Sequence, residues 1–305
     1  MRLFSFFILY LAFSLPGIAQ PSPLDAYTVD QINLPPDLNK QVCISGMKFY
    51  NKQLYLASER CPFIIVFDPE KRQISNTINL RVPQNFEMEG MTSYKDKLYL
   101  VSESKAAVYE VTIATGAVKT MQTSIPLPEK LKSGDGMEGI AANEKNNKFY
   151  LLRERNEDLT KSQLYTFSVE KSSESGDFML KYESMIEMPL ETPQWRYSDI
   201  CFDSDKDRLL CLKSYSKGKS RQQYLESIDI DNSGKLLEAT RKTIPVENFT
   251  DASIAYKTQD YSMNLEGITI DDNGTIYIIS DNTSGKASCD VEAKEKTILL
   301  HLRKK

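Results

Sequence analysis

The chain has 305 residues, 41% hydrophobic and 26% charged, so it can bury a core as one large all-β domain or as two smaller domains. Its 38 basic and 42 acidic residues leave a net charge of −4, and no block of Lys and Arg indicates a nucleic-acid partner. The single histidine, His301, argues against histidine-based zinc sites and against Ser-His-Asp hydrolases.

The first nineteen residues have the pattern of a signal peptide. Arg2 supplies the positive charge, Leu3–Leu15 is apolar, and Pro16–Ala19 places small residues before the expected cleavage point. The apolar run is too short to span a bilayer, so no membrane span is expected. The sequence therefore predicts a signal peptide at 1–19, one mature domain at 20–305, and a periplasmic or secreted location.

Five related units follow one another along the mature chain. The clearest begin near residues 43, 87, 136 and 262, and a weaker copy occupies 195–230. Each unit has a short apolar strand, a polar turn, a second strand of the LYL-S-E type and an alternating third strand. The turns carry hairpin signals at Asn51-Lys52, Asp96-Lys97, Asn146-Asn147 and Asn273-Gly274. Repeated antiparallel units of this kind are typical of a β-propeller.

We therefore expect an all-β protein, a five-bladed β-propeller of four-stranded antiparallel blades. Fourth strands are predicted at Gln73–Leu80, Val118–Ile125 and Leu237–Ile244. The last unit shows only three strands before Lys305, and we expect Asp25–Leu34 to supply its fourth, so that the N-terminal strand closes the last blade. A linear solenoid or two sandwiches would leave that segment without a role.

Three units carry a glutamate directly before the glycine that opens their first strand. Opposed residues of an antiparallel hairpin have position numbers with a constant sum, which places a second carboxylate opposite each glutamate. Opposed like charges destabilise a sheet, and oxygen ligands without histidine favour Ca²⁺ over zinc. The sequence predicts a Ca²⁺ site with Glu89, Glu138 and Glu266 as ligands, and with Glu103, Glu154 and Asp281 as secondary ligands or outer-shell supports.

Other roles remain open for these carboxylates. Ser45 and Ser198 replace the glutamate in the first and fourth units, so a full fivefold ring of charge is not expected. The acidic side chains could instead accept backbone hydrogen bonds from neighbouring blades, lie solvated on the rim, or take part directly in catalysis.

The same register arithmetic applies to the five cysteines. It places Cys43 opposite Cys61 and Cys201 opposite Cys211, which makes both pairs candidate disulfides in an oxidising compartment. Two buried thiols in each hairpin are the alternative. Cys289 is expected to have no partner.

The strand start EG(M/I), followed about fourteen residues later by YL-S-E/D, resembles the bacterial SdiA-regulated family. That resemblance implies a five-bladed propeller with a calcium site and no established activity. The family named for the esterase-like activity of phytase shares the EG…E rhythm and is a close competitor. The fourth unit departs from the pattern, with Ser198-Asp199 in place of Glu-Gly and Lys213-Ser214 in place of Ser-Glu.

Two functions of different classes are consistent with the sequence. The first is an exported, monomeric, calcium-binding propeller that binds a small-molecule or protein ligand at the channel mouth without catalysis, since no nucleophile–base pair can be named. The alternative, kept open by the phytase-like resemblance, is a metal-dependent hydrolase of phosphate esters, other esters or lactones. Glu103 or Glu154 would then act as general base. Whether the protein is an enzyme stays open at this point.

Overall fold

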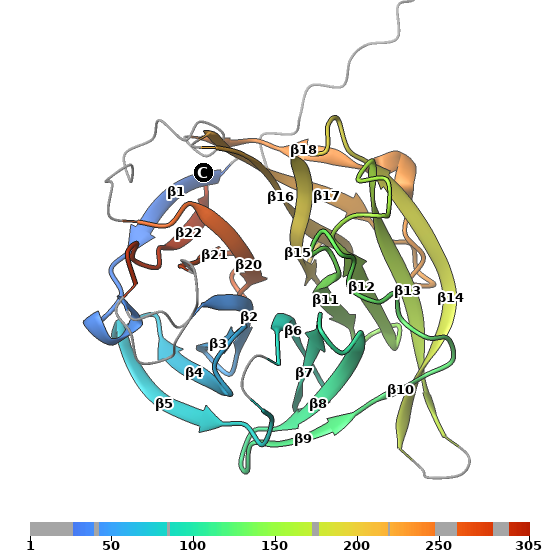
Figure 1. The fold of residues 1–305 in the computed structure, drawn as a ribbon, viewed down its shortest axis with the longest axis horizontal. Coiled ribbons are helices and arrows are strands. Elements are labelled where there is room, and N and C mark those ends of the chain that lie inside the picture. Colours follow the sequence, from blue (N-terminus) through green and yellow to red (C-terminus); the bar gives the residue numbers. More distant parts are fainter. Residues whose placement is uncertain are drawn as a thin grey trace, which may run out of the picture.

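Short apolar strands joined by tight turns build five sheets. A computed structural model describes residues 27–39, 43–83, 86–172, 177–218, 220–247, 261–282 and 293–305; the predicted signal peptide lies outside these ranges. The sheets stand side by side in a ring, with one strand of each at the centre (Figure 1). This arrangement confirms the predicted five-bladed propeller.

The first three blades each contain four consecutive antiparallel strands, and the third has one short addition. Blade 1 consists of β2 (Ile44–Tyr50), β3 (Gln53–Ser58), β4 (Phe63–Asp68) and β5 (Gln73–Asn79). Blade 2 consists of β6 (Met88–Tyr94), β7 (Lys97–Ser102), β8 (Ala107–Thr112) and β9 (Ala117–Thr120). Blade 3 consists of β11 (Met137–Asn143), β12 (Lys148–Arg153), β13 (Lys161–Lys171) and β14 (Phe178–Pro189), with β10 (Gln122–Thr123) parallel to β14. The strand predicted at Val118–Ile125 is therefore divided between blades 2 and 3.

Blades 4 and 5 complete the ring. Blade 4 consists of β15 (Trp195–Asp203), β16 (Arg208–Lys217), β17 (Ser220–Asp229) and β18 (Lys242–Ile244). Blade 5 consists of β20 (Asn264–Ile270), β21 (Ile276–Asp281), β22 (Leu299–Lys304) and β1 (Tyr27–Ile32), with β19 (Val246–Glu247) parallel to β1. The fourth strand of blade 4 is shorter than the predicted Leu237–Ile244, because a 3₁₀ turn occupies Glu238–Thr240.

The N-terminal strand closes the last blade, as predicted. β1 pairs antiparallel with β22, from Tyr27 opposite Lys304 to Ile32 opposite Leu299. Tyr27 and Ile32 are buried, and Asp30 accepts a hydrogen bond from Arg303 across the pair. The first and last described strands are thus joined in one sheet, which closes the ring (Figure 1).

The hydrophobic core lies between blades. It divides into five clusters, and each cluster takes its side chains from two neighbouring blades. Between blades 2 and 3, for example, Tyr94 and Tyr99 pack edge-on against Phe149 with ring centroids 5.3 and 5.2 Å apart. Each blade therefore depends on both neighbours to cover its two apolar faces.

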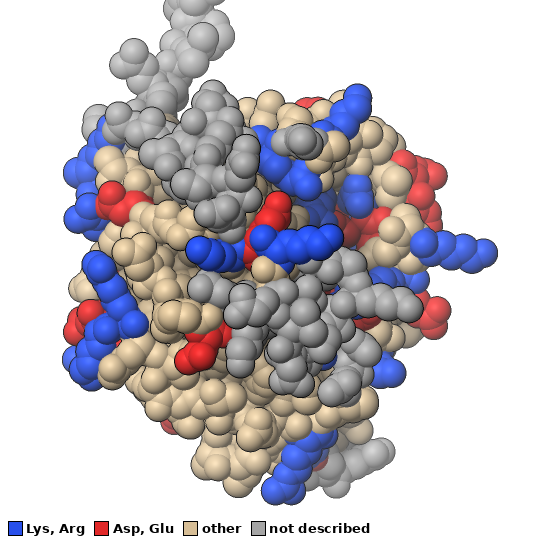
Figure 2. All heavy atoms as spheres, turned by 60° about the vertical axis from the view of Figure 1, so that its left-hand side comes forward, with Lys and Arg blue, Asp and Glu red and all other residues tan. Residues whose placement is uncertain are grey.

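The surface carries charges of both signs. On the face drawn in Figure 2, Lys and Arg side chains are interspersed with Asp and Glu among neutral residues. The helices in the described ranges are two 3₁₀ turns, Pro36–Asn39 and Glu238–Thr240, and neither has the length or apolar character needed to cross a membrane.

Candidate functional site at the acidic end of the ring

Every innermost strand contains an irregularity near its start. The register shifts between Ile44 and Gly46, Met88 and Met91, Met137 and Gly139, Tyr197 and Asp199, and Leu265 and Gly267. The residues within these bulges are Ser45, Glu89-Gly90, Glu138, Ser198 and Glu266. A bulge leaves its extra residue outside the ladder and redirects the side chain. The three predicted glutamate ligands therefore occupy equivalent places at one end of the five central strands.

The bulges also correct the predicted register. Glu103 lies opposite Glu87, Glu154 lies opposite Gly136, and Asp281 pairs with Asn264, because the extra residue displaces each partner. Direct opposition to Glu89, Glu138 and Glu266 was therefore wrong. All the same, the two sets lie near one another. Together with Glu59 and Glu87 they form what we call the acidic cluster: Glu59, Glu87, Glu89, Glu103, Glu138, Glu154, Glu266 and Asp281.

Burial and mutual repulsion shift the titration of these groups. Glu89, Glu103, Glu154 and Glu266 are at most 6% exposed. Burial, with repulsion from neighbouring carboxylates as a second cause, raises the pKa of Glu89 and Glu138 well above the usual range. Burial raises the pKa of Glu103 to about 7 and that of Glu266 to about 8, although a cation opposes the shift in both cases.

Arg196 offsets part of the negative charge of the acidic cluster. Its Nη1 donates to Glu154 Oε1 at 2.7 Å, and its Nη2 donates to Glu266 Oε1 at 2.6 Å and to Asn264 Oδ1 at 2.8 Å. Arg196 comes from blade 4, the blade that contributes no carboxylate at the bulge. One guanidinium therefore joins blades 3, 4 and 5 at the acidic end, a role that the sequence analysis missed.

Two further cations lie on the other side of the cluster. Lys130, in the segment before β11, contacts Glu103 at 2.5 Å and Glu87 at 3.1 Å. Arg60 contacts Glu59 at 2.9 Å. Neither residue was singled out from sequence, because both lie in loops that vary from unit to unit.

The carboxylates between blades 2 and 3 have the fewest hydrogen-bond donors and cations around them. Glu89 accepts a hydrogen bond from the Ser45 hydroxyl, whereas no residue in the described ranges donates one to the Glu138 carboxylate. The buried Oε1 atom of Glu103 also has no hydrogen-bond partner. These oxygens have the donor chemistry that Ca²⁺ prefers. As they stand, no three acidic, histidine or cysteine side chains of the described chain converge closely enough to hold an ion.

The raised pKa values predict an unusual dependence of stability on pH. A carboxyl whose pKa is higher in the folded state than in the unfolded chain binds extra protons on folding, so its contribution is lost as pH rises through the folded value. With Glu103 and Glu266 near 7 and 8, the melting temperature in chelator should fall between pH 5 and pH 8. His301, whose pKa is lowered by burial, acts oppositely below pH 6.5. A melting temperature that rises across pH 7 to 8 would contradict the expectation; Glu103→Gln and Glu266→Gln should each flatten the slope.

The predicted disulfides are wrong. Cys43, Cys201 and Cys211 are thiols, and Cys61 is disulfide-bonded but not to Cys43. The bulge in β15 places Cys201 opposite Leu210 and Cys211 opposite Ile200, so the two thiols are offset by one residue. Cys289 lies outside the described residues.

Comparison with known proteins places the chain in a family. A family model described as phytase-like, with esterase-like activity of phytase, matches residues 46–283. The chain belongs to the phytase-like family. Of the two families that the repeat pattern indicated, this is the one whose model matches, and the five-bladed ring fits both. No curated protein sequence matches this phytase-like propeller.

Solved structures resemble the phytase-like propeller only distantly. Glutaminyl cyclase from Myxococcus xanthus is 13% identical, with a TM-score of 0.48 over 91% of this chain and 97% of that one. A gluconolactonase from Xanthomonas campestris is 10% identical, with a TM-score of 0.41 over 87% of both chains. The PQQ-bound aldose sugar dehydrogenase from Streptomyces coelicolor is 10% identical, with a TM-score of 0.46 over 91% and 98%. These likenesses carry no argument about activity.

Proposed function

We propose that this phytase-like propeller binds Ca²⁺ at the acidic cluster, and that the ion holds an anionic or ester ligand at this mouth of the ring. The observation that carries the proposal is the excess of carboxylate. Among the described residues, four cations, Arg60, Lys130, Arg155 and Arg196, face seven glutamates, and Arg155 is also paired with Asp135. The glutamates are Glu59, Glu87, Glu89, Glu103, Glu138, Glu154 and Glu266. A divalent cation would relieve that repulsion.

The proposed ligands are carboxylate oxygens of the cluster to which no Lys or Arg side chain of the described chain donates a hydrogen bond. Glu89 and Glu138 would bind the ion through their bulged positions, with the free Oε1 of Glu103 as a third donor. Glu154, Glu266 and Asp281 would flank it, because Arg196 already holds the first two. Binding would require the side chains of Glu89, Glu103 and Glu138 to turn toward a common point.

Calorimetric titration with Ca²⁺ and thermal melts tests this proposal. The ion should raise the melting temperature of the wild-type protein, more at pH 8 than at pH 5, because bound carboxylates must be ionised. Glu138→Gln should abolish the stabilisation and Glu266→Gln should weaken it less. Glu144→Gln, at the opposite end of β11, is the matched control and should leave it unchanged. If wild-type protein binds no Ca²⁺, the metal assignment is wrong.

Hydrolysis is a second candidate function, favoured by a specific feature of Glu103. The pKa of Glu103, about 7, suits proton transfer near neutral pH, and its Oε1 atom has no hydrogen-bond partner. The family to which the chain belongs is also named for esterase-like activity. The ion would polarise a phosphate ester, another ester or a lactone while Glu103 accepts a proton from water. Glu154 is less suited as the base, because Arg196 occupies it.

A screen of phosphate esters, p-nitrophenyl esters and lactones, with Ca²⁺ and with chelator, separates the two functions. Chelator-sensitive turnover that falls about 10²- to 10⁴-fold in Glu103→Gln, with wild type and variant both saturated with Ca²⁺, would establish the enzyme. Ca²⁺ binding without turnover on any of these substrates would leave the binding function. We further propose that the protein is exported, to the periplasm or the medium, and acts as a monomer on a small-molecule or protein ligand.

A further inference from the structure

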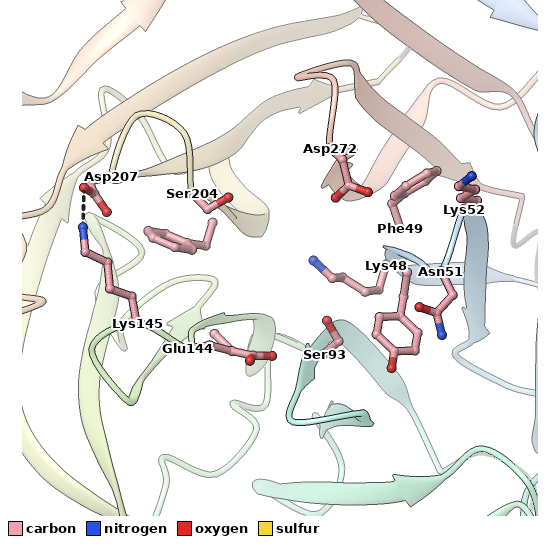
Figure 3. Close-up of a pocket in the computed structure, with 13 residues that line it drawn as sticks. Lys48, Phe49, Asn51, Lys52, Ser93, Glu144, Lys145, Ser204, Asp207 and Asp272 are labelled. Atoms are coloured by element: carbon pink, nitrogen blue, oxygen red, sulfur yellow. Dashed lines mark hydrogen bonds and ion pairs between the residues drawn. The ribbon is translucent and has the colours of Figure 1, made fainter.

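The opposite end of the ring contains a cavity of about 540 Å³. All five blades line it, through the ends of their central strands and the turns that follow. Phe49 and Phe202 provide apolar surface, and Ser93, Glu144, Ser204 and Asp272 provide polar groups (Figure 3). This volume is in the range of small-molecule sites.

Lys48 breaks the repeat at the level of this cavity. Two residues after the strand-opening position, the other blades have Thr92, Ala141, Cys201 and Thr269, all small and at most 6% exposed. The Thr92 hydroxyl accepts a hydrogen bond from Ala142 N at 3.1 Å, and the Thr269 hydroxyl accepts one from Phe49 N at 3.0 Å. These hydrogen bonds join blade 2 to blade 3 and blade 5 to blade 1, and a lysine ammonium cannot accept such a bond. Lys48 is the one long side chain at this level.

The Lys48 side chain extends into the cavity rather than to a counter-ion. Figure 3 shows its amine in the open centre, with Asp272 and Ser204 on one side and Glu144 and Ser93 on the other. Within the described chain no carboxylate lies within 4.0 Å of its Nζ. By contrast, Lys145 at the same mouth is paired with Asp207 at 3.0 Å. Burial lowers the pKa of Lys48, while Asp272 and Glu144 oppose that shift from a distance.

The Lys48 ammonium is half-buried and has no carboxylate within ion-pair distance in the described chain, so a bound anion would satisfy it. The carboxylates around it can accept hydrogen bonds from hydroxyl groups of the same ligand, and the serine hydroxyls can donate or accept them. We propose that this cavity binds a small hydroxylated organic anion, with Lys48 as the charged anchor. The site is separate from the acidic cluster and does not depend on the proposed Ca²⁺.

Calorimetric titrations in the presence of chelator test the proposal with three probes: glucuronate, glucose 6-phosphate and glucose. The first two distinguish a carboxylate from a phosphate as the preferred anion, and glucose measures the hydroxyl groups alone. We expect at least one of the anions to bind, and glucose to bind at least about tenfold more weakly.

Lys48→Thr is the informative variant, because it restores the residue that blades 2 and 5 use at this level. Its hydroxyl should accept a hydrogen bond from Ser93 N, so the protein should melt at the same or a higher temperature while losing at least about tenfold in anion affinity. Lys145→Thr, which removes a paired lysine from the same mouth, should bind nearly as the wild type does. Equal affinity in Lys48→Thr, an equal loss in Lys145→Thr, or no binding tighter than about 1 mM in the wild type would each overturn the proposal.

Discussion

Replacing Arg196 with methionine should lower the free energy of unfolding by about 3 kcal/mol at pH 8. The variant leaves Glu154 and Glu266 buried without the guanidinium that bridges them, and methionine fills a similar volume without charge. At pH 5 Glu266, whose pKa is about 8, is protonated, so the loss should shrink toward that of the hydrogen bonds, about 1 to 2 kcal/mol. Chemical denaturation at the two pH values measures both.

Arg221→Met provides the control for the Arg196 experiment. Arg221 also belongs to blade 4, but it is solvent-accessible, and its partners among the described residues are the backbone carbonyls of Gly218 and Ser220. Its replacement should change stability by less than about 0.5 kcal/mol. An Arg196→Met cost that is no larger than this, or that does not change with pH, would show that the guanidinium does not neutralise the cluster.

Gly46→Ala should be the most damaging single methyl addition in the central strands. An ideal Cβ at Gly46 would lie 2.0 Å from the carbonyl oxygen of Glu89, which belongs to the bulge of the next blade. Neither backbone can move without opening the contact between blades 1 and 2. We expect a loss of more than about 3 kcal/mol, measured by chemical denaturation, or a chain that does not fold.

The other central glycines give a graded comparison. At Gly90 the nearest atom to a new Cβ is Ile140 N at 2.6 Å, and at Gly139 the nearest atoms are 3.0 Å away. The loss of stability should therefore decrease from Gly46→Ala through Gly90→Ala to Gly139→Ala. Equal losses would mean that backbone contact does not set the spacing of the central strands. Because Gly139→Ala should fold, the series remains informative even if Gly46→Ala does not.

The blades could be predicted because the turn residues and the alternating pattern that define each hairpin lie within a short stretch of sequence. Two-residue turns such as Asn51-Lys52, in which both residues have positive φ, fix each inner hairpin, and alternation fixes which side chains face a neighbouring blade. The closing strand could be predicted by counting strands, because the last unit showed only three and the segment Asp25–Leu34 belonged to no unit. Propeller geometry then left a single place for it.

The register at the acidic end was wrong for a reason that is itself visible in the sequence. Met88 and Met91 lie in one core cluster, and Leu265 and Ile268 lie in another, although residues three apart should face opposite sides of a strand. Apolar residues at a spacing of three, repeated in every unit, indicate one extra residue in each strand. That signal would have predicted the bulges, and with them the correct neighbours of the cysteines.

The cations of the site were harder to anticipate. Arg196 belongs to the fourth unit, which has Ser198 and Asp199 where the pattern has glutamate and glycine. Its side chain contacts carboxylates of two other blades. Contacts between blades depend on the closed ring, so hairpin arithmetic within one unit cannot show them. Asp199, which replaces the glycine of that unit, illustrates the same limit: its carboxylate accepts hydrogen bonds from Ile200 N at 2.8 Å and from Ile268 N of blade 5 at 2.9 Å.

The shared sheet of β1 and β22 has a consequence for the order of folding. During synthesis β1 emerges before the other described strands of the ring and β22 emerges after them, so β1 has no antiparallel partner until β22 has been made. Contacts between such distant parts of a chain are slow to form, and the interval exposes an unpaired strand edge. The ring can therefore close only after β22 has been synthesised.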